Sequence, residues 1–412
     1  MYMDDTAIIG GGATGLCIAY YFKKLIYYKK KDLTIIEASP DVGGLAGYTT
    51  VQGELMEKFY HHIFQTDTNI IELINELGLG NKLYWVDDYA SMYDGTYKFK
   101  YAGPIDILKA PILNPYEKLR LITVLAFFIY YPGTKYLKKL TAYEWGERFL
   151  PRNVNEQIIV PLLKAKFSTY YKDIASVWLR SRFESRGKSK GKLGYMEGSF
   201  APVFEKLKEK LIEEDVKFIF NKSVPFFPKN KIIDGKKYYK LIYTTPVPTK
   251  LSPIEYLGAL SLIIELKVPL MADYWLSITD KDNPPFLVIV NQSYINKKLK
   301  NVYYLSGYYK MNSDIMKRMS QGEIESLFFT YLKKIFPKFD KSDVIKTHLF
   351  KKDYAQPIVG LDYEAKIPPF MDRYRNSRPN VLIVNMSQIF PQDRGMNYAV
   401  KLAKYFVLNN YI

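Results

Sequence analysis

The sequence has few side chains that could form disulfides or bind metal ions. Cysteine occurs once in 412 residues, as Cys17, so we expect no disulfide within the chain and a cytoplasmic location, where thiols stay reduced. Histidine occurs three times, as His61, His62 and His348. Because structural and catalytic zinc is usually held by clusters of Cys and His, we predict no metal site.

The chain also lacks an apolar run of the roughly 20 residues that a membrane-spanning helix needs. Residues 121–131 carry no charge over 11 positions. Basic residues flank this segment: Lys118, Arg120, Lys135, Lys138 and Lys139. Such a run is typical either of a buried helix, which we expect here, or of an interfacial helix whose basic flanks attract anionic lipid. Because a strand pattern begins at Thr6, we expect no signal peptide.

Acidic residues are outnumbered, with 42 Asp and Glu against 59 Lys and Arg, which gives a net charge of +17. The excess is scattered along the chain, which is typical of solvated faces. It would also attract an anionic lipid surface or a phosphorylated or nucleotide-linked substrate. No nucleic-acid-binding motif accompanies the charge, so we expect no nucleic-acid partner. The length suits two or three lobes, and 48% hydrophobic residues suffice for a large core.

The N-terminal segment has the order strand, glycine-rich turn, helix, strand. Residues 6–9 (TAII) are a short apolar strand, and 10–15 (GGGATG) give the pattern G-x-G-x-x-G. A helix is expected from Leu16 to about Tyr28, and 33–36 (LTII) form a second strand that ends on Glu37. This combination predicts a βαβ unit that binds a dinucleotide.

Each part of this unit has a physical role. Gly10 permits the tight turn, Gly12 lets backbone approach a pyrophosphate, and Gly15 lets the helix pack on the strand. The helix N-terminus around Ala13 and Thr14 offers free N–H groups to phosphates. Glu37 is placed to accept hydrogen bonds from ribose hydroxyls.

The residues after Glu37 distinguish FAD from NAD. "EASPDVGGLAGY" (37–48) resembles the E-x(5)-G-G extension of the FAD-dependent amine oxidase, protoporphyrinogen oxidase and phytoene desaturase superfamily. The resemblance implies that the glycine pair and its neighbours contact the cofactor: Ala38, Gly43, Gly44, Leu45 and Ala46. Leu45 stands where a basic residue often follows the pair.

The same resemblance implies further FAD contacts later in the chain. A strand at 217–224 would place Val224 beside the adenine, and 240–248 resembles the family's strand that ends in A-T-P, with Thr245 and Pro246 over the cofactor. Near the C-terminus a strand (381–384), a turn (391–395) and a helix (396–408) resemble the motif that points a helix N-terminus at the flavin. The contacts implied there are Asp393, Arg394, Gly395, Met396 and Asn397. The usual strand-end Gly-Asp is replaced by Asn385-Met386-Ser387.

His61 and His62 are the candidate catalytic residues. They lie in a segment that, by resemblance, leaves the FAD domain and passes the flavin ring. Adjacent residues of a strand point to opposite faces, so we expect at most one of them to face the ring, slightly favouring His61. The alternative is that one packs and the other is solvated.

The intervening segments are predicted to form the substrate domain. Alternating residues over 258–309 predict an antiparallel sheet, with Tyr274, Trp275 and Phe286 as candidate pocket residues. Asp67-Thr68-Asn69 is expected to cap a helix that stops at Gly78. Residues 186–192 are expected to form a flexible basic loop that is either a linker or a phosphate contact.

We therefore predict an α/β fold: a Rossmann-type FAD-binding domain (1–60, 190–250 and 370–412) with a discontinuous α+β substrate domain (61–189 and 251–369). The implied function is an FAD-dependent oxidoreductase that oxidises or desaturates a small substrate, anionic or lipophilic, by hydride transfer to the flavin. One alternative is a non-redox flavoenzyme similar to UDP-galactopyranose mutase, favoured if Arg180, Arg182 and Arg186 met a diphosphate. Another is a non-catalytic flavin-binding membrane-associated protein, favoured if side chains filled the pocket. Oligomeric state stays open.

Overall fold

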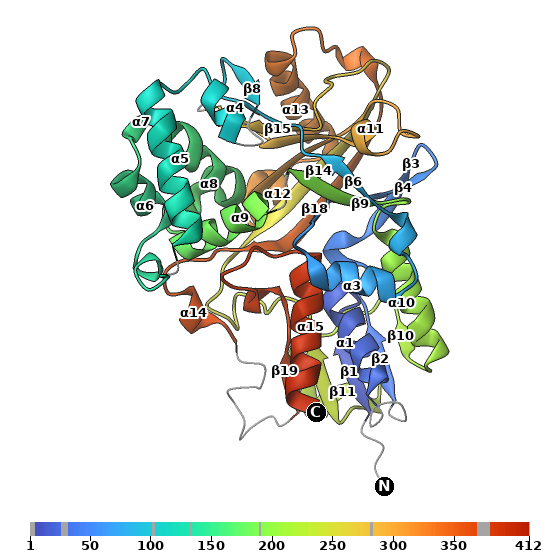
Figure 1. The fold of residues 1–412 in the computed structure, drawn as a ribbon. Coiled ribbons are helices and arrows are strands. Elements are labelled where there is room, and N and C mark those ends of the chain that lie inside the picture. The colour runs from blue at the N-terminus through green and yellow to red at the C-terminus, as the bar shows by residue number, and fades with distance from the viewer. Residues whose placement is uncertain are drawn as a thin grey trace.

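The computed structural model describes residues 5–25, 32–100, 104–131, 133–188, 191–280, 283–368 and 380–411. It contains two large sheets with helices packed around them (Figure 1).

The first sheet is parallel and has five strands in the order β10-β2-β1-β13-β19. These strands come from distant parts of the chain: β1 (Thr6–Ile9), β2 (Leu33–Ile36), β10 (Lys217–Ile219), β13 (Lys240–Tyr243) and β19 (Val381–Ile383). Parallel neighbours with helical crossovers are the hallmark of a Rossmann-type α/β fold, so the predicted fold class is confirmed.

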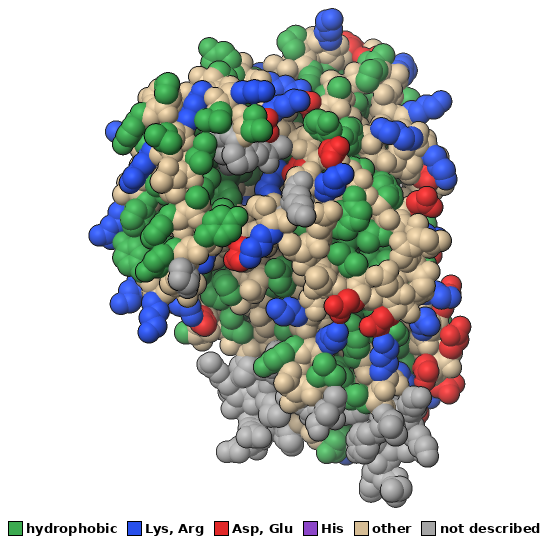
Figure 2. Space-filling model, viewed as in Figure 1, with side chains coloured by type: hydrophobic (Ala, Val, Ile, Leu, Met, Phe, Trp, Pro, Cys, Tyr) green, Lys and Arg blue, Asp and Glu red, His purple; other side chains and the backbone are tan. Residues whose placement is uncertain are grey.

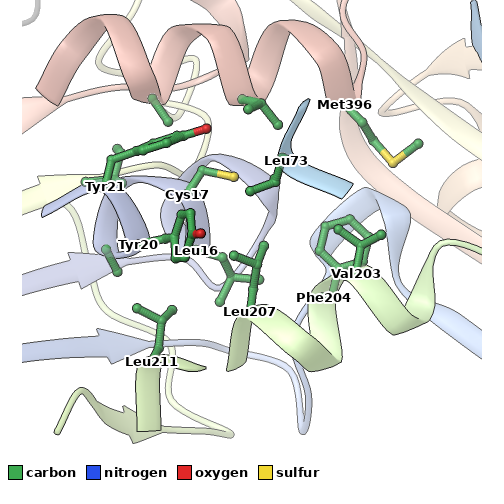
Figure 3. Close-up of a cluster of buried hydrophobic side chains, with 14 of the residues drawn as sticks. Leu16, Cys17, Tyr20, Tyr21, Leu73, Val203, Phe204, Leu207, Leu211 and Met396 are labelled. Carbon is green, nitrogen blue, oxygen red and sulfur yellow. The ribbon is translucent and has the colours of Figure 1, made fainter. Parts of the chain in front are cut away.

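Four helices cover one face of this sheet: α1 (Ala13–Lys24), α3 (Thr68–Glu76), α10 (Ala201–Glu213) and α15 (Met396–Tyr411). Strand residues alternate between faces, so Ile8, Ile35 and Ile242 pack beneath the helices. Figure 3 shows the helix side of this core, where Cys17 and Leu16 of α1 meet Leu207 of α10 and Leu73 of α3. The opposite face packs against the hairpin of β11 (Ile232–Ile233) and β12 (Lys236–Lys237).

The second sheet has seven strands in the order β18-β14-β17-β16-β15-β7-β8. Its strands are β7 (Ala90–Tyr93), β8 (Lys98–Lys100), β14 (Tyr256–Leu266), β15 (Trp275–Ile278), β16 (Val288–Asn291), β17 (Val302–Lys310) and β18 (Val344–Pro357). The strands expected over 258–309 are present, but the sheet is mixed because β15 pairs with β7 in parallel. The long strand β18 was not predicted from the sequence, because Lys346, Lys351 and Lys352 interrupt its apolar pattern.

Helices flank this sheet on both sides. One group is α4 (Pro104–Lys109), α5 (Pro115–Tyr130), α6 (Ala142–Phe149), α7 (Arg152–Val154), α8 (Val160–Phe167) and α9 (Ser176–Lys188). The other is α12 (Asp314–Lys317) and α13 (Gln321–Ile335). Short elements complete the chain: β3 (Tyr48–Val51), β4 (Glu54–Glu57), β5 (Ile63–Phe64), β6 (Leu83–Asp87), β9 (Lys192–Met196), α11 (Gln292–Ile295) and α14 (Tyr363–Lys366).

Two helix boundaries differ from the sequence expectation. Helix α1 begins at Ala13 instead of Leu16, and residues 26–28 of its expected end lie outside the described residues. The expected basic loop at 186–192 is wrong at its start, because residues 186–188 are the last turn of α9. The predicted division into two domains stays a prediction. The five-stranded sheet draws on residues 6–36, 217–243 and 381–383, and the seven-stranded sheet on 90–100 and 256–357.

Candidate functional site

The glycine-rich turn joins β1 to α1 in the tight geometry that its sequence predicts. Gly10 has φ +112°, a conformation that other residues rarely adopt. A Cβ on Gly15 would lie 2.0 Å from the Gly10 carbonyl oxygen, so only glycine allows this packing of helix on strand. A Cβ on Gly12 would meet nothing closer than 3.8 Å, the Cα of Gly44. Thus Gly10 and Gly15 are needed by the fold itself, whereas Gly12 is not.

The N-terminus of α1 is open to a ligand. Gly12 is its N-cap, no side chain caps it, and its first turn, which holds Ala13 and Thr14, contains no acidic residue. A helix end with free N–H groups and no acidic neighbour is suited to an anion such as a pyrophosphate.

Glu37 and the glycine pair are held against this turn. The Glu37 carboxylate is 8% exposed and accepts hydrogen bonds from the backbone N–H groups of Gly11 (2.7 Å) and Ser39 (2.8 Å). Gly43 donates its N–H to the Gly11 carbonyl at 2.9 Å. A Cβ on Gly44 would come within 3.2 Å of Gly12, so backbone meets backbone here. Next to them, Ala38 is exposed and Ala46 is buried.

The expected adenine strand is wrong in its extent. Strand β10 stops at Ile219, because Asn221 takes φ +56° and the N–H of Lys222 turns back to the Glu37 carbonyl. Val224 therefore lies in a loop, half-buried against the sheet face that carries Ile9 and Ile36.

Thr245 and Pro246 follow β13 at the same sheet edge and are half-buried. The Asn385 amide is fully buried beside them and donates to the Thr245 carbonyl at 2.9 Å. The residue that replaces the family's Gly-Asp therefore ties the end of β19 to the end of β13.

The C-terminal motif forms a turn followed by α15, as its sequence predicts. Gly395 has space for a Cβ, with no atom within 4 Å. The Asn397 side chain accepts from the N–H groups of Asn69 (3.0 Å) and Ile70 (3.3 Å). It thereby caps α3 in place of Asp67, whose carboxylate accepts from the Phe64 N–H instead, so the expected cap by the 67–69 segment is wrong. Gly78 ends this helix as expected, at φ +75°.

A cavity of about 250 Å³ opens between the parallel sheet's C-terminal motif and the seven-stranded sheet. Its walls come from Leu45, residues 59–64, helices α8 and α9, strands β14 to β17 and residues 393–398. The predicted residues Leu45, His61, His62, Asp393, Arg394, Gly395, Met396 and Asn397 line it. The remaining predicted cofactor residues lie outside its lining, along the glycine turn and the strand ends described above.

Both histidines line the cavity, and the expectation that at most one of them faces the flavin ring stays a prediction. Residues 60–62 are not in a strand, so the alternation on which that expectation rested does not apply. His61 Nδ1 lies 2.6 Å from the Phe59 carbonyl, and His62 packs edge-on against Phe64 and Trp275. Burial lowers the pKa of His61 to about 4 and that of His62 to about 3, with the positive charges of Arg394 and Arg182 adding to the effect.

Of the three aromatic pocket candidates, only Trp275 lines the cavity. Tyr274 is buried in a hydrogen bond with Tyr195, and Phe286 packs against Phe328 in the core. The sequence pattern does not distinguish these three residues, because all of them lie in strand-like apolar segments.

Cationic side chains at the cavity were largely missed by sequence reasoning. Lys166 and Arg182 both donate to one oxygen of Asp393, at 2.7 and 2.6 Å. Arg394 donates to the Tyr308 hydroxyl at 2.8 Å. Arg182 belongs to the arginine group noted in the sequence. Lys166 could have been noticed as a charged residue within the largely apolar segment that forms α8. Among the described residues no group of three His, Cys, Asp or Glu side chains could hold a metal ion.

These residues fit a dinucleotide cofactor. The features that fit are the open α1 N-terminus, the free space over Gly12 and Gly395, and the Glu37 carboxylate at the end of β2. The chain supplies the groups that such a cofactor needs. Backbone N–H donors suit the phosphates, the Glu37 carboxylate suits a ribose, and a chamber with apolar walls suits a ring.

Comparison with known proteins agrees with this architecture. Residues 8–77 match the family model of the NAD(P)-binding Rossmann-like domain. A 78-residue stretch is 37% identical to coproporphyrinogen III oxidase of Bacillus subtilis (strain 168), covering 18% of this chain and 17% of that protein.

Solved structures match over almost the whole chain. A protoporphyrinogen oxidase structure from Exiguobacterium sp. 255-15 has a TM-score of 0.76 at 15% identity, covering 99% of both chains. Reduced UDP-galactopyranose mutase has a TM-score of 0.74 at 13% identity, covering 100% of this chain and 95% of that one. Cyclohexylamine oxidase of Brevibacterium oxydans IH-35A has a TM-score of 0.70 at 14% identity, covering 99% and 98%. The chain therefore shares the fold of these oxidase and mutase structures.

Proposed function

We propose that this protein is an FAD-dependent oxidoreductase that removes a hydride from a small organic substrate. The observation that carries the proposal is the shared cavity. Leu45, beside the glycine pair, and Gly395 to Asn397, at the start of α15, line the same chamber as strands β14 to β17. Elements suited to a dinucleotide thus meet the seven-stranded sheet across one cavity.

Residues from both ends of the chain would hold one cofactor. Gly10 to Gly15 would take the pyrophosphate, Glu37 the ribose, and Gly395 to Asn397 the flavin ring. Ala38, Gly43, Gly44, Ala46, Val224, Thr245 and Pro246 would complete the site. When bound, FAD would supply the redox chemistry by accepting a hydride from a substrate carbon. The chain's own residues would orient the substrate and exclude water.

His61 and His62 would act as neutral hydrogen-bonding groups. Because burial keeps their pKa values at about 4 and about 3, neither carries a proton to give near neutral pH, and each is a weak base. The carbonyl of Phe59 fixes the orientation of the His61 ring through Nδ1. This assigns the histidines to positioning rather than to proton transfer.

The experiment is anaerobic reduction of the purified yellow protein. Candidate amines, porphyrinogens and polyenes are added in turn, and bleaching of the flavin absorbance is followed. The proposal expects bleaching by one class and none by the others. Purified protein that binds stoichiometric NAD and no flavin would refute it.

A second candidate is a non-redox reaction on a nucleotide sugar, as the name of UDP-galactopyranose mutase suggests for that protein. Arg182 and Arg186 line the cavity, which favours it, whereas Arg180 donates to the carbonyls of Ile129 and Gly133 and lies outside the lining. Conversion of a nucleotide sugar by the reduced protein, with no net flavin oxidation, would select this candidate. The remaining alternative, a non-catalytic flavin-binding membrane-associated protein, would be favoured if side chains filled the pocket beside the flavin ring.

We also propose peripheral contact with anionic membranes through α5. The segment is only partly buried: Leu121 and Phe128 face the core, while Leu119 and Phe127 are 67% and 65% exposed. Figure 2 shows hydrophobic and basic side chains interspersed on this side of the molecule, at the left. Among the described residues no helix is both long enough and apolar enough to cross a bilayer, so the contact would be interfacial.

A further inference from the structure

Four cationic side chains converge on the cavity from three parts of the chain. Lys166 comes from α8, Arg182 and Arg186 from successive turns of α9, and Arg394 from the turn before α15. Sequence separation is large, so the fold and not a local motif gathers them.

The carboxylates in the same region do not balance these charges. Asp393 accepts from both Lys166 and Arg182 through a single oxygen, and its other oxygen is buried without a partner. Asp88 pairs with Arg186 at 2.7 Å. Asp67, which also lines the cavity, accepts from the Phe64 backbone.

Arg394 has no carboxylate partner among the described residues. Its guanidinium donates to the Tyr308 hydroxyl at 2.8 Å, and its Nε is buried without a hydrogen bond. Lys166, Arg182 and Arg394 therefore share one carboxylate, Asp393. Lys166 and Arg394 are half-buried and Arg182 is more exposed, and a cation that is partly removed from water without a matching charge favours binding of an anion.

Neighbouring titratable groups respond to this positive field. Burial alone would raise the pKa of Asp393, but Lys166 and Arg182 lower it to about 2. Burial would also raise the pKa of Tyr308, yet Arg394 and Lys166 bring it below its ordinary value. Each shift favours the negatively charged form of a group in the chamber.

Apolar side chains predominate in the rest of the lining, which also holds Ser277, Ser306 and Asn397. Leu162, Phe183 and Trp275 form walls beside the cations. A chamber with cations on one side and aliphatic and aromatic walls on another suits a ligand with one anionic group on an apolar body.

We infer that this cavity binds an organic anion, whose carboxylate or phosphate group is held by Lys166, Arg182 and Arg394 and whose apolar body lies against Trp275. The inference rests on the proposed function and narrows its substrate class. We expect cationic amines to bind weakly, because Lys166, Arg182 and Arg394 outnumber the two carboxylates that line the cavity, Asp67 and Asp393.

The test uses the flavin-loaded protein and matched probes of one shape: benzoate, phenyl phosphate, benzyl alcohol and benzylamine. Binding is measured by isothermal titration calorimetry, which does not require turnover. The inference expects benzoate or phenyl phosphate to bind at least tenfold more tightly than benzyl alcohol, and benzylamine to bind most weakly. A tighter phenyl phosphate would identify a phosphate-bearing substrate, and a tighter benzoate a carboxylate-bearing one.

Variants then locate the site. Lys166→Gln and Arg182→Gln should each weaken the anionic probe at least tenfold while flavin content stays unchanged. Arg180→Gln is the matched control on the same helix, and it should bind the anion as the parent does. Equal affinity for benzylamine and benzoate, or unchanged anion binding in both cavity variants, would overturn the inference. Absence of flavin from the purified parent would instead overturn the proposed function.

Discussion

At the scale of single residues, Glu57 is a buried carboxyl with few partners. It is 6% exposed, and it accepts a hydrogen bond from the Phe200 N–H at 2.8 Å. Burial raises its pKa from 4.5 to about 7, despite that hydrogen bond. The folded protein therefore holds its proton more tightly than the unfolded chain does. Stability from this group is fully present below pH 4.5 and is lost as the pH rises through about 7.

Glu57→Gln should remove this pH dependence, because the amide keeps an acceptor for Phe200 and cannot ionise. We expect the parent to lose on the order of 2–3 kcal/mol more of its free energy of unfolding than the variant between pH 4.5 and pH 8. Urea denaturation at the two pH values measures it. The exposed Glu213→Gln is the control and should follow the parent. Parallel pH curves for Glu57→Gln and the parent would contradict the assignment.

The histidines give a second residue-scale prediction, which concerns rate. Because the pKa values of His61 and His62 are lowered to about 4 and about 3 by burial, they do not titrate near neutrality. His61 and His62 should therefore contribute no step near the ordinary histidine value of 6.5 to the pH profile of flavin reduction. His61→Gln should keep the shape of that profile. A step at this pH that disappears in His61→Gln would show that the residue transfers a proton.

At the scale of elements, the start of α15 also organises α3. Asn397→Ala removes the acceptor for the N–H groups of Asn69 and Ile70. We expect a loss of about 1 kcal/mol in the free energy of unfolding, as for other helix caps. Asn409→Ala, at the exposed end of the same helix, should be near neutral. If Asn397→Ala loses flavin with no loss of stability, the residue contacts the cofactor and its capping role is minor.

Helix α5 gives the prediction for membrane contact. The double variant of Leu119→Ser and Phe127→Ser removes exposed apolar side chains and should leave stability unchanged. The double variant should co-sediment less than the parent with phosphatidylglycerol-containing vesicles. Both the parent and the double variant should bind pure phosphatidylcholine vesicles more weakly than vesicles that contain phosphatidylglycerol. Ile345→Ser changes a similarly exposed apolar residue on β18 and serves as the control. Equal vesicle binding by the parent and the double variant would contradict an interfacial role for α5.

Elements with a strong local signal were predictable. Strands β1 and β2 match the predicted residues, since short β-branched runs bounded by Asp32, Gly10 and Glu37 leave little choice. Strand β18 was missed because its pattern is mixed polar, and the 217–224 strand was drawn too long because Asn221 turns the chain. Residues 186–188 were expected in a loop from their sequence, but they form the last turn of helix α9.

At the scale of the whole molecule, the cofactor side of the site was predictable and the substrate side was not. The roles of Gly10 and Gly15 can be predicted from the local sequence, because a turn of this kind needs glycine. Lys166 and Arg394 acquire theirs only when α8 and the C-terminal turn meet across the cavity. Contacts between segments more than 200 residues apart leave no periodic signal in one sequence.

The central claim is that one FAD lies along the glycine turn and reaches the cavity at Gly395. Its most direct test is the flavin content of the purified protein and of Gly12→Ala. A Cβ on Gly12 meets no protein atom closer than 3.8 Å, so the variant should fold, yet it occupies the space where a pyrophosphate would lie. Gly322→Ala is the matched control, on an exposed helix with nothing within 4 Å.

We predict about one FAD per chain for the parent and for Gly322→Ala, and at least tenfold weaker FAD binding for Gly12→Ala, which corresponds to about 1.4 kcal/mol. Thermal unfolding of the flavin-free forms should coincide. A parent without flavin, or a Gly12→Ala variant that binds FAD as tightly as the parent does, would contradict the account.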